Sequence, residues 1–203
     1  MKLLIGSNNH HKIGEFSQIF ADLPVEITFL EKEGITLDPE ETGRTFEENA
    51  ILKAKAFAEV SGLVTLADDS GLEVDALNGE PGVYSARYGG KAKDDHAGRN
   101  RLVLAKLADL NLQDAARTAR FRCVIAIASP SGEVQLAEGA VEGVIAHQAM
   151  GDGGFGYDPI FYLPEFGKTL AQLPAETKNK ISHRGRAARA AVPLLLNWNS
   201  RSD

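Results

Sequence analysis

The sequence predicts an α/β fold built on a mixed β-sheet, with residues 1–203 forming a single domain. Helix-like and strand-like stretches alternate along the chain, which is typical of α/β proteins. A long strand–turn–strand segment over residues 119–146 lies among them and indicates antiparallel pairing within the sheet. The chain is also long enough to bury one sizeable core. We therefore expect parallel and antiparallel strands in one sheet flanked by helices.

The N-terminal quarter predicts a strand, a helix and a second strand. Residues 2–7, KLLIGS, form a short apolar run that ends in small and polar residues, as a buried strand does. Apolar residues then recur at helical spacing from Ile13 to Phe20. Residues 7–12 are therefore expected to form a strand-to-helix turn with backbone N–H groups free to bind an anion. Residues 25–30, VEITFL, alternate in polarity and suit the second strand.

A second helix is predicted over about residues 46–60. Thr45 is followed three residues later by Glu48, which is the pattern of a capping box. Asn49 and Lys53 are four residues apart, so they share one face of this helix.

The next apolar strand, residues 63–67, is expected to end at Asp68, where the sequence reads DDSG. Acidic residues, Ser and Gly all favour turns, so a turn is the simpler interpretation. Two adjacent carboxylates at a strand end, with the pair Glu40 and Glu41 earlier in the chain, would also suit a hard cation such as Mg²⁺. From the residues alone both interpretations stay open.

The C-terminal half predicts two more helices around the hairpin. A helix over residues 94–110 is expected to be capped by its first residue, and the hairpin should turn at residues 129–132. Residues 150–161 are rich in glycine and read as a loop. The last helix should begin at about Ser182 and be interrupted or ended near Pro193.

Composition excludes several classes of protein. The formal net charge of −6 argues against a nucleic-acid binder, which needs a broad basic surface. The first residues turn polar after three apolar ones, so they predict neither a signal peptide nor a membrane anchor. The single cysteine, Cys123, excludes an intramolecular disulfide and is expected to be buried in a strand. A cytoplasmic protein is the expectation that fits this cysteine usage.

Three further features suggest a binding site for an anionic nucleotide. Several lysines and arginines fall in short clusters within an acidic chain, as if converging on a small anion. In FGYDP, residues 155–159, an aromatic ring could stack on a flat base while Asp158 accepts hydrogen bonds; packed aromatics in a loop are an equally good interpretation. In SHR, residues 182–184, His183 and Arg184 could face an anion or a carbonyl, or simply end a surface helix. Taken together, these features favour a nucleoside triphosphate site.

The chain resembles the inosine triphosphate pyrophosphatase family over roughly residues 2–198. The stretches that carry the resemblance are SNNHHK, TFEENAILKA, ADDSGLEVDALNGEPGVYSARY, GFGYDPIF and ISHRGRA, in the family's order and spacing. The resemblance implies an elongated mixed α/β fold with two lobes and a central cleft, and a homodimer. It also implies Mg²⁺-dependent hydrolysis of non-standard purine triphosphates (ITP, dITP and XTP) to the monophosphate and pyrophosphate.

Specific roles follow from the same resemblance. Asp69 and Lys53 match the catalytic positions, as proton acceptor and phosphate contact, and Glu41 and Asp69 match the metal-associated carboxylates. The positions that match substrate-binding residues are Ser7, Asn8, Asn9, His10, His11, Lys12, Lys53, Ser70, Phe155, Gly156, Tyr157, Asp158, Lys178, His183 and Arg184. A donor from Lys178, His183 or Arg184 aimed at the 6-oxygen of the base would disfavour adenine. Two alternatives are kept: a Maf-like nucleotide pyrophosphatase of other base preference, and a non-catalytic nucleotide-binding protein.

Overall fold

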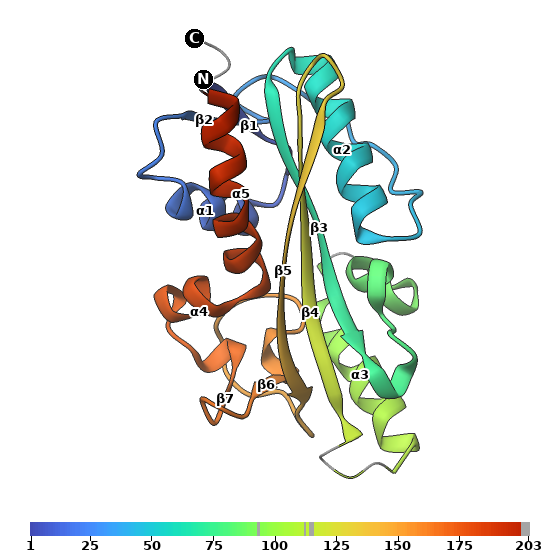
Figure 1. Cartoon of the computed structure of the whole chain (residues 1–203). Coiled ribbons are helices and arrows are strands. Elements are labelled where there is room, and N and C mark those ends of the chain that lie inside the picture. Colours follow the sequence, from blue (N-terminus) through green and yellow to red (C-terminus); the bar gives the residue numbers. More distant parts are fainter. Residues whose placement is uncertain (93, 112, 114–115, 200–203) are drawn as a thin grey trace. The chain divides into compact units, whose positions relative to one another are not determined.

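The computed structural model describes residues 1–199 apart from 93, 112, 114 and 115 (Figure 1). Within it the chain forms two compact units. The first unit, called unit 1 below, comprises Met1–Asp69, Cys123–Gly139 and His183–Asp203. The second, unit 2, comprises Ser70–Arg122 and Ala140–Ser182. Each unit has its own apolar core.

The strands form one mixed sheet, as the sequence predicts. They are β1 (Lys2–Ile5), β2 (Glu26–Phe29), β3 (Val64–Val74), β4 (Thr118–Ala128), β5 (Val134–Ile145), β6 (Phe161–Leu163) and β7 (Lys168–Thr169). Their order across the sheet is β2-β1-β3-β4-β5-β6-β7. Strand β1 pairs in parallel with β2 and β3, whereas β6 pairs antiparallel with β5 and β7. The predicted α/β class is therefore confirmed.

The α-helices begin mostly where their capping residues predict. They are α1 (His10–Ile19), α2 (Phe46–Ser61), α3 (His96–Asp109), α4 (Ala175–Ile181) and α5 (His183–Asn199). At the start of α2, Thr45 Oγ1 accepts from the Glu48 N–H at 3.1 Å, as expected from the capping box. The cap of helix α3 lies one residue later than predicted, because Asp95 rather than Asp94 accepts from the Gly98 N–H.

The core of unit 1 lies on both faces of its part of the sheet. Side chains alternate along β1, so Leu3 and Ile5 pack into one apolar cluster and Leu4 into another. The first cluster includes residues of α1 and α5, and the second includes Phe57 of α2. Figure 1 shows α1 and α5 on one side of the strands and α2 on the other. Helices therefore cover both faces of β1 and of the adjoining half of β3.

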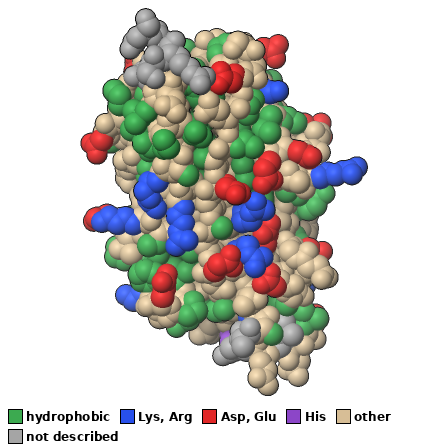
Figure 2. Space-filling model, in the orientation of Figure 1, with side chains coloured by type: hydrophobic (Ala, Val, Ile, Leu, Met, Phe, Trp, Pro, Cys, Tyr) green, Lys and Arg blue, Asp and Glu red, His purple; other side chains and the backbone are tan. Residues whose placement is uncertain are grey.

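Unit 2 is organised around a separate apolar cluster. Phe121 of β4 and Phe161 of β6 lie in contact there, with ring centroids 4.7 Å apart, and α3 adds Val103 and Leu107. On the surface of this unit Arg120 binds the carboxylates of Asp75 and Glu142, at 2.9 and 3.1 Å. Figure 2 shows basic and acidic side chains interspersed on the face in view.

Two elements in the C-terminal part differ from the prediction. Helix α5 continues through Pro193, which was expected to interrupt or end it. The helix gains apolar burial on both sides of the proline, from Ala191 before it and Leu195 and Trp198 after it, and this outweighs the missing N–H donor. The short helix α4, just before α5, was not predicted at all. Across the described residues no helix has the length and apolarity that a membrane span requires.

Candidate functional site

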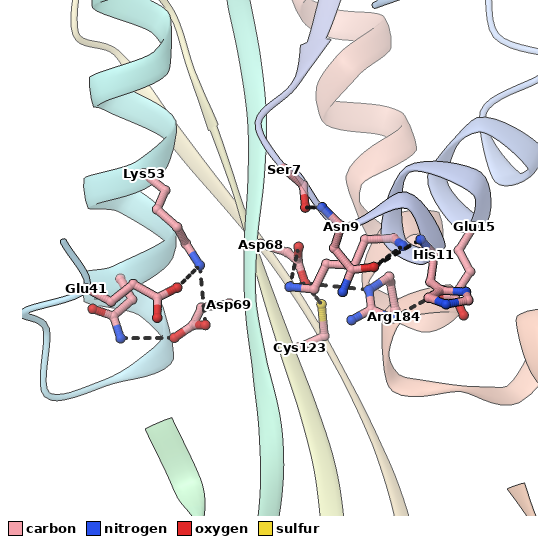
Figure 3. A network of polar contacts seen from close by, with 12 residues as sticks. Ser7, Asn9, His11, Glu15, Glu41, Lys53, Asp68, Asp69, Cys123 and Arg184 are labelled. Carbon is pink, nitrogen blue, oxygen red and sulfur yellow. Dashed lines mark hydrogen bonds and ion pairs between the residues drawn. The ribbon is translucent and has the colours of Figure 1, made fainter. Parts of the chain in front are cut away.

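Strand β3 carries Asp68 and Asp69 in its middle and places them on opposite faces. The strand does not end at Asp68 as predicted but runs on to Val74, so the interpretation of DDSG as a turn is wrong. Successive side chains on a strand point to opposite sides, so two adjacent carboxylates face different surroundings. Figure 3 shows Asp69 directed toward Lys53 and Asp68 directed toward Arg184. Each carboxylate meets cationic side chains on its own face, which allows both to be buried, at 3% and 8% exposure.

On the Asp69 face, one ammonium group lies within reach of two carboxylates. The Lys53 Nζ atom is 2.7 Å from Glu41 Oε1 and 3.4 Å from Asp69 Oδ1. Asn49, one turn before Lys53 on α2, donates from Nδ2 to Asp69 Oδ2 at 3.0 Å. The four-residue spacing seen in the sequence therefore brings both side chains to the same carboxylate. Glu41 reaches the group from the loop before α2.

Burial and charge act in opposite directions on these groups. Burial raises the pKa of Asp69 above its ordinary value, and the Lys53 charge only partly offsets this. For Lys53, burial alone would lower the pKa, but the charges of Asp69 and Glu41 outweigh it and raise the pKa. Lys53 is therefore a fixed positive charge beside two carboxylates.

Glu41 and Asp69 supply carboxylate oxygens, which are the ligands that a hard divalent cation prefers. Both carboxylates already converge on a cationic group, and Mg²⁺ commonly takes one or two protein carboxylates with waters and substrate phosphates completing its shell. Among the described residues, no group of three or more His, Cys, Asp or Glu side chains is placed to hold a metal.

On the opposite face, Asp68 is fully engaged by cations. Lys12 Nζ lies 3.0 Å from both carboxylate oxygens, and Arg184 Nε lies 3.5 Å from Oδ2. Arg184 also binds Glu15 of α1 at 2.6 Å. Burial alone would raise the pKa of Asp68, but the charges of Lys12 and Arg184 outweigh it and hold that pKa well below its ordinary value. Cys123 Sγ contacts the same carboxylate at 3.7 Å and is buried, as predicted.

The turn over residues 7–12 uses its own side chains as caps. Asn9 Oδ1 accepts from the N–H groups of His11 and Lys12, at 3.0 and 3.3 Å, and Ser7 Oγ accepts from the Asn9 N–H. The expectation that these N–H groups are free for an anion is thus not met for those three. Asn8 and His10 are exposed in the same turn.

A pocket of about 460 Å³ opens beside this turn, within unit 1. It is lined by Ser7, Asn8, His10, Ile13, Phe29, Glu31, Gly34, Ile35 and Thr36. Its volume is in the range of small-molecule sites. The turn therefore borders a space large enough for part of a nucleotide.

The predicted base-binding residues of unit 2 form a group of their own. Lys178 Nζ donates to Asp158 Oδ2 at 2.8 Å and lies 4.7 Å from the centre of the Phe155 ring. The same Asp158 oxygen accepts from the Phe155 N–H at 2.8 Å. A Cβ at Gly154 would lie 2.1 Å from this oxygen, so the loop requires glycine there. Asp158 therefore fixes both the ammonium and the start of the aromatic loop.

Tyr157 does not stack as one interpretation of FGYDP suggested. It is 3% exposed, packs in the apolar core of unit 2 and donates from its hydroxyl to the Ser85 carbonyl at 2.8 Å. Phe155 is the half-buried aromatic of the pair. Of the two rings, only Phe155 is partly exposed, and it lies beside Lys178.

The two units divide the sequence-predicted residues between them. Unit 1 brings together Lys53, Asp69 and Glu41 on one face of β3, and Lys12 and Arg184 on the other. It also contains His183, 6% exposed at the first residue of α5. Unit 2 contains Ser70, Phe155, Gly156, Tyr157, Asp158 and Lys178.

Sequence reasoning gave no role to two side chains that the structure places in the network. Asn49 was noted only for sharing a helix face with Lys53, yet it bonds Asp69 directly. Glu15 binds Arg184 across 169 positions of sequence. The four-residue spacing of Asn49 and Lys53 could have predicted the role of Asn49. The contact of Glu15 with Arg184 depends on the packing of α1 beside α5, which no local pattern shows.

Comparisons with known proteins identify the family of the chain. The Ham1 family profile matches residues 3–194. A dITP/XTP pyrophosphatase of Desulforamulus reducens is 52% identical over 196 residues, 96% of each chain, and one of Bacillus subtilis is 46% identical over 192 residues, 95% of this chain and 96% of the relative.

Solved structures of Ham1 proteins share the fold of this chain. A HAM1 protein from Coxiella burnetii superposes with a TM-score of 0.88 at 41% identity, covering 97% of this chain and 99% of that one. The Ham1 protein of Staphylococcus aureus gives a TM-score of 0.82 at 44% identity, with both chains fully covered. Since the match extends over nearly the whole sequence and over the fold, the chain belongs to the Ham1 family.

Proposed function

We propose that this protein hydrolyses dITP and XTP to the corresponding monophosphate and pyrophosphate. The chain is a nucleoside-triphosphate pyrophosphatase by its kinship with enzymes of that name, which are about half identical to it over nearly their full length. The observation that carries the proposal is the Lys53 ammonium held between the Glu41 and Asp69 carboxylates. This group presents both a phosphate-binding cation and oxygen ligands for a metal on one face of β3.

The proposed reaction follows from the charges in this group. A triphosphate carries about four negative charges, which must be offset before a nucleophile can approach phosphorus. Lys53 offsets part of this charge on the Asp69 face. A water oxygen attacks the α-phosphorus, the bond to the oxygen bridging the α- and β-phosphates breaks, and pyrophosphate leaves. Asp69 is proposed to orient that water and accept its proton.

Mg²⁺ is the proposed cofactor, and Glu41 and Asp69 are the residues that would hold it. When bound, such an ion would neutralise part of the negative charge on the phosphate oxygens. The supporting observation is that these two carboxylates already flank one cationic group. Removal of divalent cations with EDTA is expected to abolish turnover, and Mg²⁺ in excess is expected to restore it.

ITP is proposed as a further substrate, with Lys178 selecting the base. Hypoxanthine and xanthine present an oxygen at position 6, where adenine presents an amino donor. An ammonium donor fits the oxygen and leaves adenine facing a mismatched donor, at a cost of about 1–3 kcal/mol. Lys178 supports this role best of the three predicted donors, because it also contacts the Phe155 ring. Arg184 is instead committed to Asp68 and Glu15.

A substrate panel tests the proposed function. The protein is incubated with dITP, XTP, ITP, dATP, GTP and UTP in the presence of Mg²⁺, and the products are separated by anion-exchange chromatography. Pyrophosphate and monophosphate from dITP, XTP and ITP are expected. Release of orthophosphate would contradict the reaction, and preferred turnover of UTP would favour the Maf-like alternative. Tight binding of dITP without products would identify a nucleotide-binding protein.

A homodimer is also proposed, on the resemblance alone. Light scattering coupled to gel filtration checks it: a mass near twice the chain's 21.8 kDa is expected, and the mass of one chain would refute it.

A further inference from the structure

We propose that Asn49 is a positioning residue that fixes Asp69 and the Glu41 loop relative to each other. The inference rests on the proposed role of these two carboxylates in catalysis and metal binding. Asn49 itself is 0% exposed, so it acts on a substrate only through its neighbours. Its side-chain amide is bonded at both ends to parts of the site.

The direction of the amide is determined by its partners. The Gly43 N–H can only donate, and it lies 2.8 Å from Asn49 Oδ1, so this atom is the carbonyl oxygen. The Nδ2 group therefore faces Asp69 Oδ2, at 3.0 Å, and donates to it. A carboxylate can only accept, so both bonds are satisfied in this one orientation. Asp69 is thus held from one side by the amide and from the other by Lys53.

The contact to Gly43 controls the loop that carries Glu41. Gly43 lies two residues after Glu41, and the same amide that bonds Asp69 bonds its backbone. A Cβ at Gly43 would lie 2.6 Å from Asn49 Oδ1 and 2.8 Å from Glu48 Cβ, so only glycine allows this approach. The buried Asn49 amide therefore ties the loop that carries Glu41 to the strand that carries Asp69. Both of these carboxylates pair with the Lys53 ammonium.

Position 49 requires a side chain that accepts a hydrogen bond from Gly43 and donates one to Asp69, as asparagine does. Aspartate has the same shape but turns the donor into a second negative oxygen facing Asp69. Alanine removes both bonds, leaving the Gly43 N–H and Asp69 without this partner. Loss of such an outer partner costs about 10- to 100-fold in metal affinity or activity in metal sites generally. We expect a loss of this size for Asn49→Asp and Asn49→Ala.

The test compares Asn49→Asp and Asn49→Ala with Thr45→Ala as a matched control. Thr45 caps the same helix end through the Glu48 N–H but does not contact Asp69. Three quantities are measured on each protein: kcat and KM for dITP, Mn²⁺ affinity of the protein without nucleotide by electron paramagnetic resonance, and the melting temperature.

The positioning role predicts that both Asn49 variants lose about tenfold or more in kcat and in Mn²⁺ affinity, with KM for dITP changed less than kcat. Thr45→Ala should lower the melting temperature while keeping kcat and Mn²⁺ affinity within about twofold. If the Asn49 variants lose only melting temperature, as the control does, Asn49 is merely structural and the inference is wrong. Should an Asn49→Ala protein not fold, Asn49→Asp decides alone.

Failure of the proposed function gives a different result. In that case the unaltered protein releases no pyrophosphate from dITP, whatever residue stands at position 49. Failure of the positioning role requires an active unaltered protein together with Asn49 variants of unchanged kcat and Mn²⁺ affinity.

Discussion

Replacement of Asp68 by asparagine tests whether this carboxylate is needed for folding. The Asp68 side chain is 1% exposed and lies against Lys12 and Arg184, whose side chains are 17% and 2% exposed. Asparagine keeps the size of the side chain but removes the negative charge. Lys12 then loses the carboxylate that it binds, whereas Arg184 keeps its ion pair with Glu15. The variant therefore leaves part of the buried positive charge without a negative partner.

The expected cost follows from this burial. Removal of one partner from a buried ion pair costs about 3–5 kcal/mol. Because the amide oxygen of asparagine can still accept a hydrogen bond and Glu15 still binds Arg184, the lower end, about 3 kcal/mol, applies. An unfolding entropy of about 2.1 cal/mol/K per residue gives about 0.4 kcal/mol/K for 203 residues. The melting temperature should therefore fall by about 7 °C.

Calorimetry of the unaltered protein, Asp68→Asn and Asp22→Asn at neutral pH measures this difference. Asp22 is exposed in unit 1, so its replacement should change stability by less than about 0.5 kcal/mol. If Asp68→Asn melts within about 1 °C of the unaltered protein, the network around Asp68 does not stabilise the fold and the reasoning fails.

Three further predictions address packing, reactivity and base selection. A Cβ at Gly139 would lie 2.4 Å from backbone atoms of α5, so Gly139→Ala should lower the free energy of unfolding by about 1–3 kcal/mol. Gly14 in α1 has open space around it, so Gly14→Ala should raise the free energy of unfolding by up to about 1 kcal/mol. Urea unfolding measures both changes. Burial raises the pKa of the Cys123 thiol far above its ordinary value, so Ellman's reagent at about pH 8 should modify it only in unfolded protein. Lys178→Met should reduce the preference for dITP over dATP in kcat/KM by about tenfold or more, measured by pyrophosphate release.

Each of these three predictions would be contradicted by a specific result. Equal stability of the two glycine variants would mean that β5 and α5 are not in backbone contact at Gly139. Rapid modification of Cys123 in native protein would contradict its burial. An unchanged dITP preference in Lys178→Met would assign base selection to another residue.

Local signals predicted the helices of the first half well. Thr45 and Glu48 determine the start of α2 through a bond between residues three apart, so nothing distant is needed to recognise it. The positions of Asn49 and Lys53 on one face of that helix followed in the same way. The motif resemblance then named most of the candidate residues.

What sequence reasoning missed depends on contacts between distant segments. DDSG has the composition of a turn, yet it stays extended because cations from α1 and α2 meet its carboxylates on separate faces. Tyr157 and Phe155 are equivalent as aromatic residues in the sequence. Only the packing of unit 2 decides that Tyr157 joins the core and Phe155 lies beside Lys178.

The alternation along β3 explains how two adjacent aspartates can serve different purposes. Asp68 meets Lys12 at both oxygens and Arg184 at one, so its charge is balanced within the protein and contributes to the fold. Asp69 shares the Lys53 ammonium with Glu41, so in the ion pairs of the described residues two carboxylates meet the same positive charge. A group with excess negative charge gains from a further cation, whereas a balanced one does not. The face of the strand, more than the residue type, therefore decides which aspartate suits the proposed metal-assisted chemistry.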